Sequence, residues 1–146
     1  MTREFLFRSI VPPGKRKALE DLFFFNPKQH LFLPEIEATI SLLGPPEIQE
    51  NGCGLTIHVP RFVDAQNLYC FDRQSNELLA AMIYFRSEFS ELEIFHIAVN
   101  RQPEGPLNTL AVLLECVTVL KAVANQIQGV KWLTMPYGRG RLRTRS

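Results

Sequence analysis

The sequence has few cysteines and no pattern that would pair them. It contains three in 146 residues, and none lies in a Cys-x-x-Cys pair: Cys53, Cys70 and Cys116. An odd number of unpaired cysteines is typical of a reduced, intracellular chain. None of the three has an evident histidine partner, which disfavours a cysteine nucleophile.

Metal-ligand clusters and repeats are also missing. The three histidines, His30, His58 and His96, are isolated from one another and from the cysteines. The sequence therefore predicts no metal site. No internal repeat or low-complexity segment indicates a solenoid or a fibrous protein.

Long hydrophobic runs are absent. No run approaches the roughly 20 apolar residues that span a bilayer. The segment Met1-Thr2-Arg3-Glu4 lacks the charged-then-apolar order of a secretory signal. We therefore expect a cytoplasmic protein that does not associate with a membrane.

What the chain does contain is the composition of one globular domain. Its residues are 46% hydrophobic and 21% charged, with a net charge of +1. A length of 146 residues fits one domain with a sizeable core. We assign the domain to residues 1–138 and a basic tail to residues 139–146.

The basic charge is concentrated in that tail. Its arginines alternate with Gly, Leu, Thr and Ser, and they are Arg139, Arg141, Arg143 and Arg145. Three interpretations remain open: an arm that contacts phosphates, a solvated tail, or a final edge strand with its arginines in water. Acidic residues outnumber basic ones in the remainder of the chain, so we do not expect a nucleic-acid-binding protein.

Hydrophobic spacing predicts strands and helices in the first half of the chain. In order, we expect a strand over 3–10, a helix over 15–25, a helix over 34–43, a loop over 47–54, a strand over 55–59, a strand over 65–72 and a turn over 73–77.

The segment from Leu78 to Trp132 gives the clearest pattern. Two apolar strands, 78–85 and 91–99, are joined by a polar turn and predict a hairpin. An apolar helix follows to about Gln128, with Gly129 at its C-terminal cap, and a short strand covers 130–135. This strand–helix–strand order predicts a crossover connection with parallel pairing of its two strands.

The helix is apolar on more than one side. One stripe of apolar residues recurs at steps of three and four and consists of Leu110, Leu113, Leu114, Val117, Leu120, Ala124 and Ile127. Further apolar residues lie beyond that stripe: Ala111, Val112, Val119, Ala122 and Val123. A helix of this kind is expected to be covered on more than one face. Other helices of the chain or a second subunit could supply the cover.

This order of elements resembles the GNAT N-acetyltransferase superfamily, in which acetyl-CoA donates an acyl group to an amine. The residues that carry the resemblance are Phe95-His96-Ile97-Ala98-Val99 and the following Gln102-Pro103-Glu104-Gly105-Pro106-Leu107. In the family's loop pattern, Arg/Gln-x-x-Gly-x-Gly/Ala, Gln102 and Gly105 match and Leu107 departs. The resemblance implies an α+β fold with a mixed, mainly antiparallel sheet and flanking helices.

The resemblance also implies a site for acetyl-CoA and an acceptor amine, which is a small molecule or a peptide. The cofactor-binding candidates are Ile97, Val99, Gln102, Gly105, Leu107, Asn108 and Thr109. Backbone N–H groups near Ile97 to Val99 would polarise the thioester carbonyl.

Glu93 and Glu91 are the candidates for a general base, because the family often places a carboxylate on this strand. They lie two residues apart and share a face of the strand, whereas His96 is expected on the opposite face. Two solvent-facing carboxylates and a core histidine are the alternative interpretation.

Two functions therefore stand side by side. One is an acyl-CoA-dependent N-acyltransferase, and the other is a non-catalytic scaffold of the same fold. The family usually has a further helix and two more strands after its fifth strand, and the chain has only Pro136-Tyr137-Gly138 and the arginine tail there. We therefore expect a homo-oligomer or a protein partner to cover the flank of the sheet.

Overall fold

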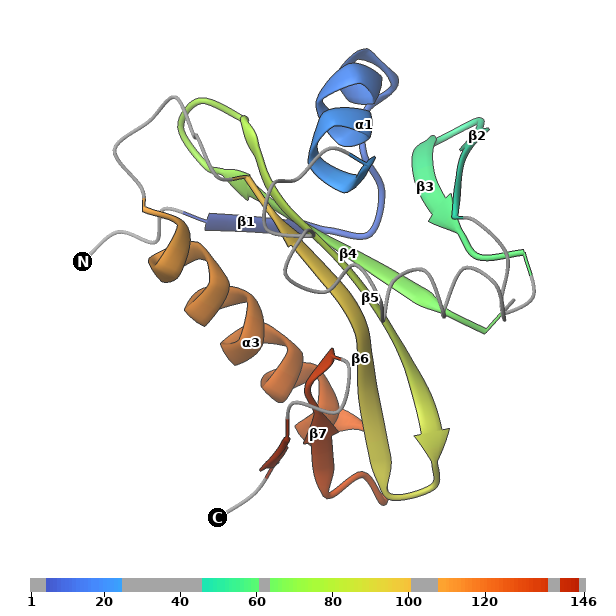
Figure 1. Ribbon diagram of the computed structural model, residues 1–146, viewed down its shortest axis with the longest axis vertical. Coiled ribbons are helices and arrows are strands. Elements are labelled where there is room, and N and C mark those ends of the chain that lie inside the picture. The colour runs from blue at the N-terminus through green and yellow to red at the C-terminus, as the bar shows by residue number, and fades with distance from the viewer. Residues whose placement is uncertain (1–4, 25–45, 61–63, 101–107, 137–139, 145–146) are drawn as a thin grey trace.

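The described part of the chain forms one mixed sheet with a helix against each face (Figure 1). The computed structural model describes residues 5–24, 46–60, 64–100, 108–136 and 140–144. The six strands, in spatial order, are β1 (Phe5–Arg8), β4 (Gln66–Asp72), β5 (Leu78–Glu88), β6 (Glu91–Val99), β7 (Trp132–Thr134) and β8 (Arg141–Arg143). The pairing of β6 with β7 is parallel and the other pairings are antiparallel. The α+β class and the parallel crossover are thus confirmed.

Among the described residues, the α-helices α1 (Arg16–Phe24) and α3 (Thr109–Gln126) cover opposite faces of the sheet. The short helix η1 (Pro13–Lys15) leads into α1, and α3 is the crossover helix. Ala81 and Ile83 of β5 belong to the core that contains Leu19 of α1, whereas Ala80 and Met82 belong to the core that contains α3. The alternation of β5 therefore divides the apolar residues between an α1 face and an α3 face. The predicted helix over 34–43 lies outside the described residues.

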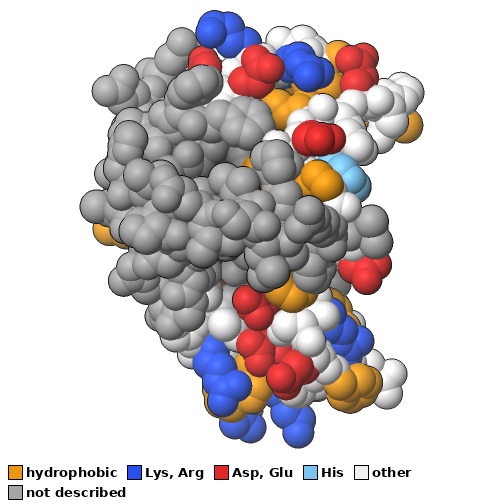
Figure 2. All heavy atoms as spheres, turned by 45° about the vertical axis from the view of Figure 1, so that its right-hand side comes forward, with side chains coloured by type: hydrophobic (Ala, Val, Ile, Leu, Met, Phe, Trp, Pro, Cys, Tyr) orange, Lys and Arg blue, Asp and Glu red, His pale blue; other side chains and the backbone are white. Residues whose placement is uncertain are grey.

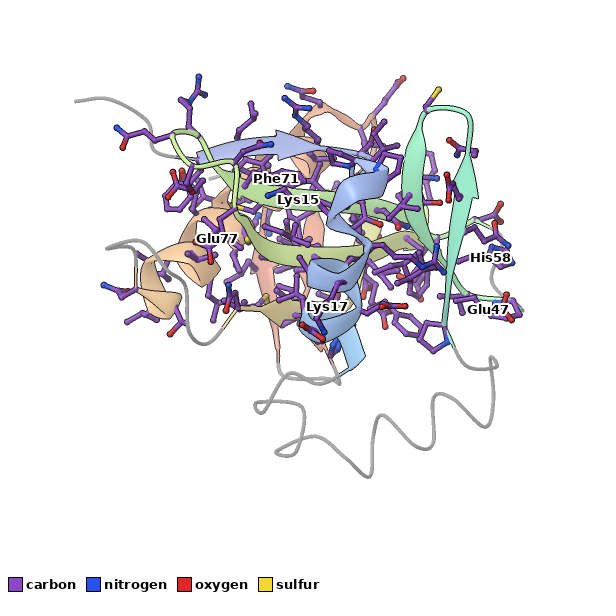
Figure 3. The ribbon with its side chains drawn as sticks, turned by 90° about the horizontal axis from the view of Figure 1, so that it is seen from above. Lys15, Lys17, Glu47, His58, Phe71 and Glu77 are labelled. Atoms are coloured by element: carbon purple, nitrogen blue, oxygen red, sulfur yellow. The ribbon has the colours of Figure 1, made fainter. Side chains whose placement is uncertain are left out.

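A separate two-stranded ribbon packs on the α1 face. It consists of β2 (Glu47–Asn51) and β3 (Gly54–His58), and Figure 3 shows Glu47 and His58 facing each other near one end of it. The loop predicted over 47–54 is therefore wrong. Only Ile48 of β2 packs on the core, so the exposed strand can be polar. Asn51 closes the hairpin, because its Oδ1 accepts hydrogen bonds from the N–H groups of Cys53 (2.9 Å) and Gly54 (3.1 Å).

The crossover helix α3 is covered on one side by the described residues. Its buried side chains are Val112, Cys116, Leu120 and Ala124, and they face the sheet. On its outer side, Leu110 and Leu114 are 63% and 59% exposed. By length and mean hydropathy, 1.3 over 18 residues, α3 would also pass as a membrane-crossing helix, a test that core helices pass too. The expected second layer of cover is not present among the described residues.

Two turns at one end of the sheet are tied together by what we call the turn clasp, formed by Arg86, Phe89, Ser90, Gln128 and Gly129. The Arg86 guanidinium donates to the carbonyl oxygens of Phe89 (3.0 Å from Nε) and Gln128 (2.8 Å from Nη2), and its carbon lies 4.6 Å from the centroid of the Phe89 ring. The backbone carbonyl oxygen of Ser90 accepts hydrogen bonds from the two N–H groups at the start of the β7 segment, at 2.7 and 3.0 Å. The clasp therefore sets where β6 and β7 start beside each other.

Gly129 is needed in the clasp for its conformation. α3 ends at Gln126, two residues before the predicted end, and Gly129 follows in the turn with φ of 90°. This backbone conformation disfavours residues with a Cβ atom. A Cβ there would also lie 2.2 Å from a carbon of the Phe89 ring.

We predict that Gly129→Ala lowers the free energy of unfolding by about 1–2 kcal/mol, the cost of a left-handed conformation for an L-residue. Urea unfolding measures this change. Gly14→Ala is the matched control, because a Cβ at Gly14 meets no atom within 4 Å. Equal stability of the two variants would contradict the role assigned to Gly129.

Candidate functional site: the fork between β6 and β7

The parallel pairing of β6 with β7 covers only the first part of β6. The paired residues are Glu91 with Trp132, Leu92 with Leu133, and Glu93 with Thr134. β6 then continues to Val99, and in the described residues no β7 residue pairs with that continuation. Figure 1 shows β7 beside the lower end of β6 only. We call Glu91–Val99 and Trp132–Thr134 the β6–β7 fork; Glu93 and Thr134 are its last pair.

A β-bulge lies two residues beyond the last pair. Ile83 of β5 pairs with His96 and Tyr84 pairs with Ile94, so Phe95 is the extra residue on β6. An extra residue reverses the face on which all later side chains lie. The core assignments agree with this reversal. Ile94 and Ala98 are four residues apart and would share a face in a regular strand, but Ile94 packs on the α3 face and Ala98 packs on the α1 face.

The bulge corrects one sequence prediction. His96 was expected on the face opposite to Glu91 and Glu93. Because His96 pairs with Ile83, an α1-face residue, it lies on the same face as both glutamates. The strict alternation on which the prediction relied holds only as far as Phe95.

Beyond the bulge, alternate backbone N–H groups of β6 point to the side on which no described residue of β7 pairs with it. The Asn100 N–H donates to the Leu79 oxygen of the β5 segment at 2.8 Å. Successive N–H groups of a strand point to opposite sides. The N–H groups of Ile97 and Val99 therefore point away from β5, toward the edge of β6 that pairs with β7 only over its first three residues. The Ile97 side chain is half-buried and that of Val99 is buried, and both are on the α3 face.

Glu91 is held by its neighbours. Its Oε2 accepts a hydrogen bond from the Thr134 hydroxyl. Its Oε1 lies 3.9 Å from Nη1 of Arg141, and the side chain is 16% exposed. The hydroxyl donor and the guanidinium thus fix the position of the Glu91 carboxylate.

Glu93 is in a different environment. Its pKa is raised, first by burial and then by the negative charge of Glu91, while a hydrogen bond with the Ser87 side chain acts in the opposite direction. A carboxylate with a raised pKa is the better proton acceptor. The two candidates of the sequence analysis are thus separated, with Glu93 as the candidate base and Glu91 as the neighbour that tunes it.

His96 is a buried, neutral side chain. It is 6% exposed, and burial lowers its pKa to about 4. An imidazole with this pKa carries no charge near neutral pH. This agrees with the core-histidine interpretation of the sequence, and His96 adds no charge beside Glu93.

The other cofactor-binding candidates are only partly described. Asn108 is the N-cap of α3, because its Oδ1 accepts from the Ala111 N–H at 2.7 Å. Thr109 is the first residue of the helix and is half-buried. Gln102, Gly105 and Leu107 lie outside the described residues, so their proposed contacts stay predictions.

The arginine tail contributes the strand that completes this end of the sheet. Arg141 and Arg143 form the edge strand β8, which was one of the three interpretations left open for the tail. Their guanidinium carbons lie 4.2 Å and 5.4 Å from the centroid of the Trp132 ring. The signal in the sequence was their spacing, since residues i and i+2 of a strand share a face.

We predict that Glu93→Gln stabilises the protein at neutral pH, because it removes a partly buried charge next to Glu91. The pKa of Glu93 is raised in the folded state above its ordinary value of 4.5. The folded state therefore holds the proton more tightly, and this group disfavours folding as pH rises through its pKa. Urea unfolding from pH 4 to pH 7 should show the variant gaining over the wild type with rising pH. A constant difference across that range would contradict the assignment.

Comparison with known proteins does not assign the chain to a family. No protein-family model matches the chain. No curated protein matches it either. Among solved structures, it is similar to the crystal structure of nourseothricin acetyltransferase, with a TM-score of 0.45 and 14% identity over 91% of this chain and 73% of that one. A likeness of this size is too small to carry a function.

Proposed function

We propose that the protein is an acyl-CoA-dependent N-acyltransferase that works at the β6–β7 fork. One observation carries the proposal: the parallel pairing ends at Glu93, whose pKa is raised, and beyond it the Ile97 N–H points to the open side. A proton acceptor and a backbone donor thus lie along one strand, on either side of a bulge. This is the arrangement that transfer of an acyl group to an amine needs.

The reaction follows from these two groups. The thioester carbonyl of acetyl-CoA would accept a hydrogen bond from the Ile97 N–H, which stabilises the negative charge that develops on its oxygen. The nitrogen lone pair of the amine attacks the carbonyl carbon, forming the C–N bond. The C–S bond breaks, and the thiolate of CoA leaves and takes up a proton. Glu93 receives the proton of the amine, directly or through one water.

Glu91 acts on this step through its neighbour. Thr134 and Arg141 hold Glu91 beside Glu93, where the Glu91 carboxylate contributes to the raised pKa of Glu93. A general base is most effective when its pKa approaches the working pH. We therefore assign Glu91 as a positioning residue.

The test is release of CoA thiol from acetyl-CoA in the presence of primary amines. Glu93→Gln should lower kcat by about 10²–10⁴-fold, the range for loss of a general base. The wild-type kcat/KM should rise with pH through the pKa of Glu93, and the variant should lose that limb of the profile. Glu50→Gln, at an exposed position of β2, is the control and should behave as the wild type.

Two results would overturn the proposal. One is a wild-type protein that releases no thiol with any amine above the rate of the uncatalysed mixture. The other is a Glu93→Gln variant with wild-type kcat and an unchanged pH profile. The alternative of a non-catalytic scaffold would then be preferred.

Association of copies of the chain, expected from the sequence, stays a prediction. We propose that it takes place through the outer side of α3, because Leu110 and Leu114 are large apolar side chains that the described residues leave exposed.

A further inference from the structure

Arg141 and Arg143 are held side by side on one aromatic ring. Both lie on the edge strand β8, where Arg141 pairs with Thr134 and Arg143 pairs with Trp132. Their guanidinium carbons are 4.2 Å and 5.4 Å from the Trp132 ring centroid. Stacking on an aromatic face restricts a guanidinium and leaves its N–H donors free to point outward. The Arg141 side chain is still 53% exposed.

These arginines share a face with the candidate base. Pairing across the strands gives two rows, Glu91–Trp132–Arg143 and Glu93–Thr134–Arg141. Paired residues lie on one face of a sheet, and neighbouring strands are about 4.8 Å apart, so the backbones of β6 and β8 are about 10 Å apart. The Arg141 side chain spans much of this gap, since its Nη1 lies 3.9 Å from Glu91 Oε1. Carboxylate and guanidinium groups therefore lie within the length of one small molecule.

The charges of this face are separated by strand. The carboxylates lie on β5 and β6, where Glu88 pairs with Glu91 and Glu93 follows two residues later, and the guanidinium groups of Arg141 and Arg143 lie on β8. Glu91 offsets Arg141, whereas Arg143 has no carboxylate within ion-pair distance among the described residues. Figure 2 shows acidic and basic side chains next to one another at the lower end of the molecule. A surface with its negative and positive charges on different strands favours a ligand that has two poles, a cationic amine toward β6 and an anion toward β8.

We propose that Arg141 and Arg143 bind the carboxylate of the acceptor, so that the acceptor is an amino acid: an amine and a carboxylate on one small molecule. This inference rests on the proposed N-acyltransferase function, because it places the amine at Glu93. A guanidinium pairs with a carboxylate through two parallel N–H donors. A phosphate, with its higher charge, would face the two glutamates and is disfavoured.

The test compares amino acids with their amides, which lack the negative charge. The probes are glycine, β-alanine, 4-aminobutyrate and 6-aminohexanoate, each beside its amide, so the series also measures the spacing between the poles. In the thiol-release assay, the best amino acid should exceed its amide in kcat/KM by roughly 10–100-fold, as expected for hydrogen bonds to a charged group. Arg143→Gln should remove most of this preference.

Two further variants complete the design. Arg143→Lys keeps the charge but not the paired donors, and it should restore only part of the preference. Lys131→Gln removes a nearby exposed charge and should leave the preference as in the wild type. Circular dichroism confirms that each variant is folded.

A binding measurement separates this inference from the proposed function. The chain has one tryptophan, Trp132, so its fluorescence reports on the arginine pair without any catalysis. The change in Trp132 fluorescence should give a lower Kd for the amino acids than for their amides. In the Arg143→Gln variant the two Kd values should be equal. Equal affinity for acid and amide in the wild type would overturn the inference. The expected titration without any thiol release would uphold carboxylate binding and overturn the proposed function.

Discussion

The parallel pairing of β6 with β7 over three residues is the constraint on which the site depends. Parallel strands need a crossover, so α3 must lie across the sheet to bring β7 beside β6. The turn clasp then sets the register, because Ser90 accepts hydrogen bonds from the start of the β7 segment and Arg86 joins the two turns. With this register, Glu93 and Thr134 become the last pair, and β6 extends beyond its partner.

The two glutamates at this end of β6 lower the stability of the fold. Glu91 and Glu93 are both partly buried, on one face and two residues apart, and the charge of Glu91 together with burial raises the pKa of Glu93. Thr134 and Arg141 compensate Glu91, whereas Glu93 is compensated by Ser87 only in part. A carboxylate that is compensated only in part lowers the free energy of unfolding, but its raised pKa makes it a better proton acceptor. Functional sites often show this conflict between stability and activity.

Much of the fold was predictable because its patterns are local. The period of α3, the hairpin of β5 with β6 and the parallel crossover follow from apolar spacing and turn residues. The strand β2 was not predictable, because a strand of an exposed ribbon carries polar residues that resemble a loop. The bulge at Phe95 was not predictable either, since no residue in Ile94–His96 marks an extra position.

The site was predictable only in part for the same reason. Glu91 and Glu93 could be named from the family resemblance, but their different environments come from Thr134, Arg141 and Ser87, which are distant in sequence from one or both. The contact of Arg141 and Arg143 with Trp132 required the antiparallel return of β8. Pairings across strands decide such contacts, and no short motif records them.

Titration of the protein with acetyl-CoA, followed by the amide signals of its backbone in NMR spectra, tests the central claim most directly. If the β6–β7 fork receives the thioester, the amide signals of Ile97 and its neighbours on β6 should shift on binding, while those of β1, on the far edge of the sheet, should not. Absence of any shift at millimolar acetyl-CoA, or shifts confined to residues away from β6 and β7, would contradict the account.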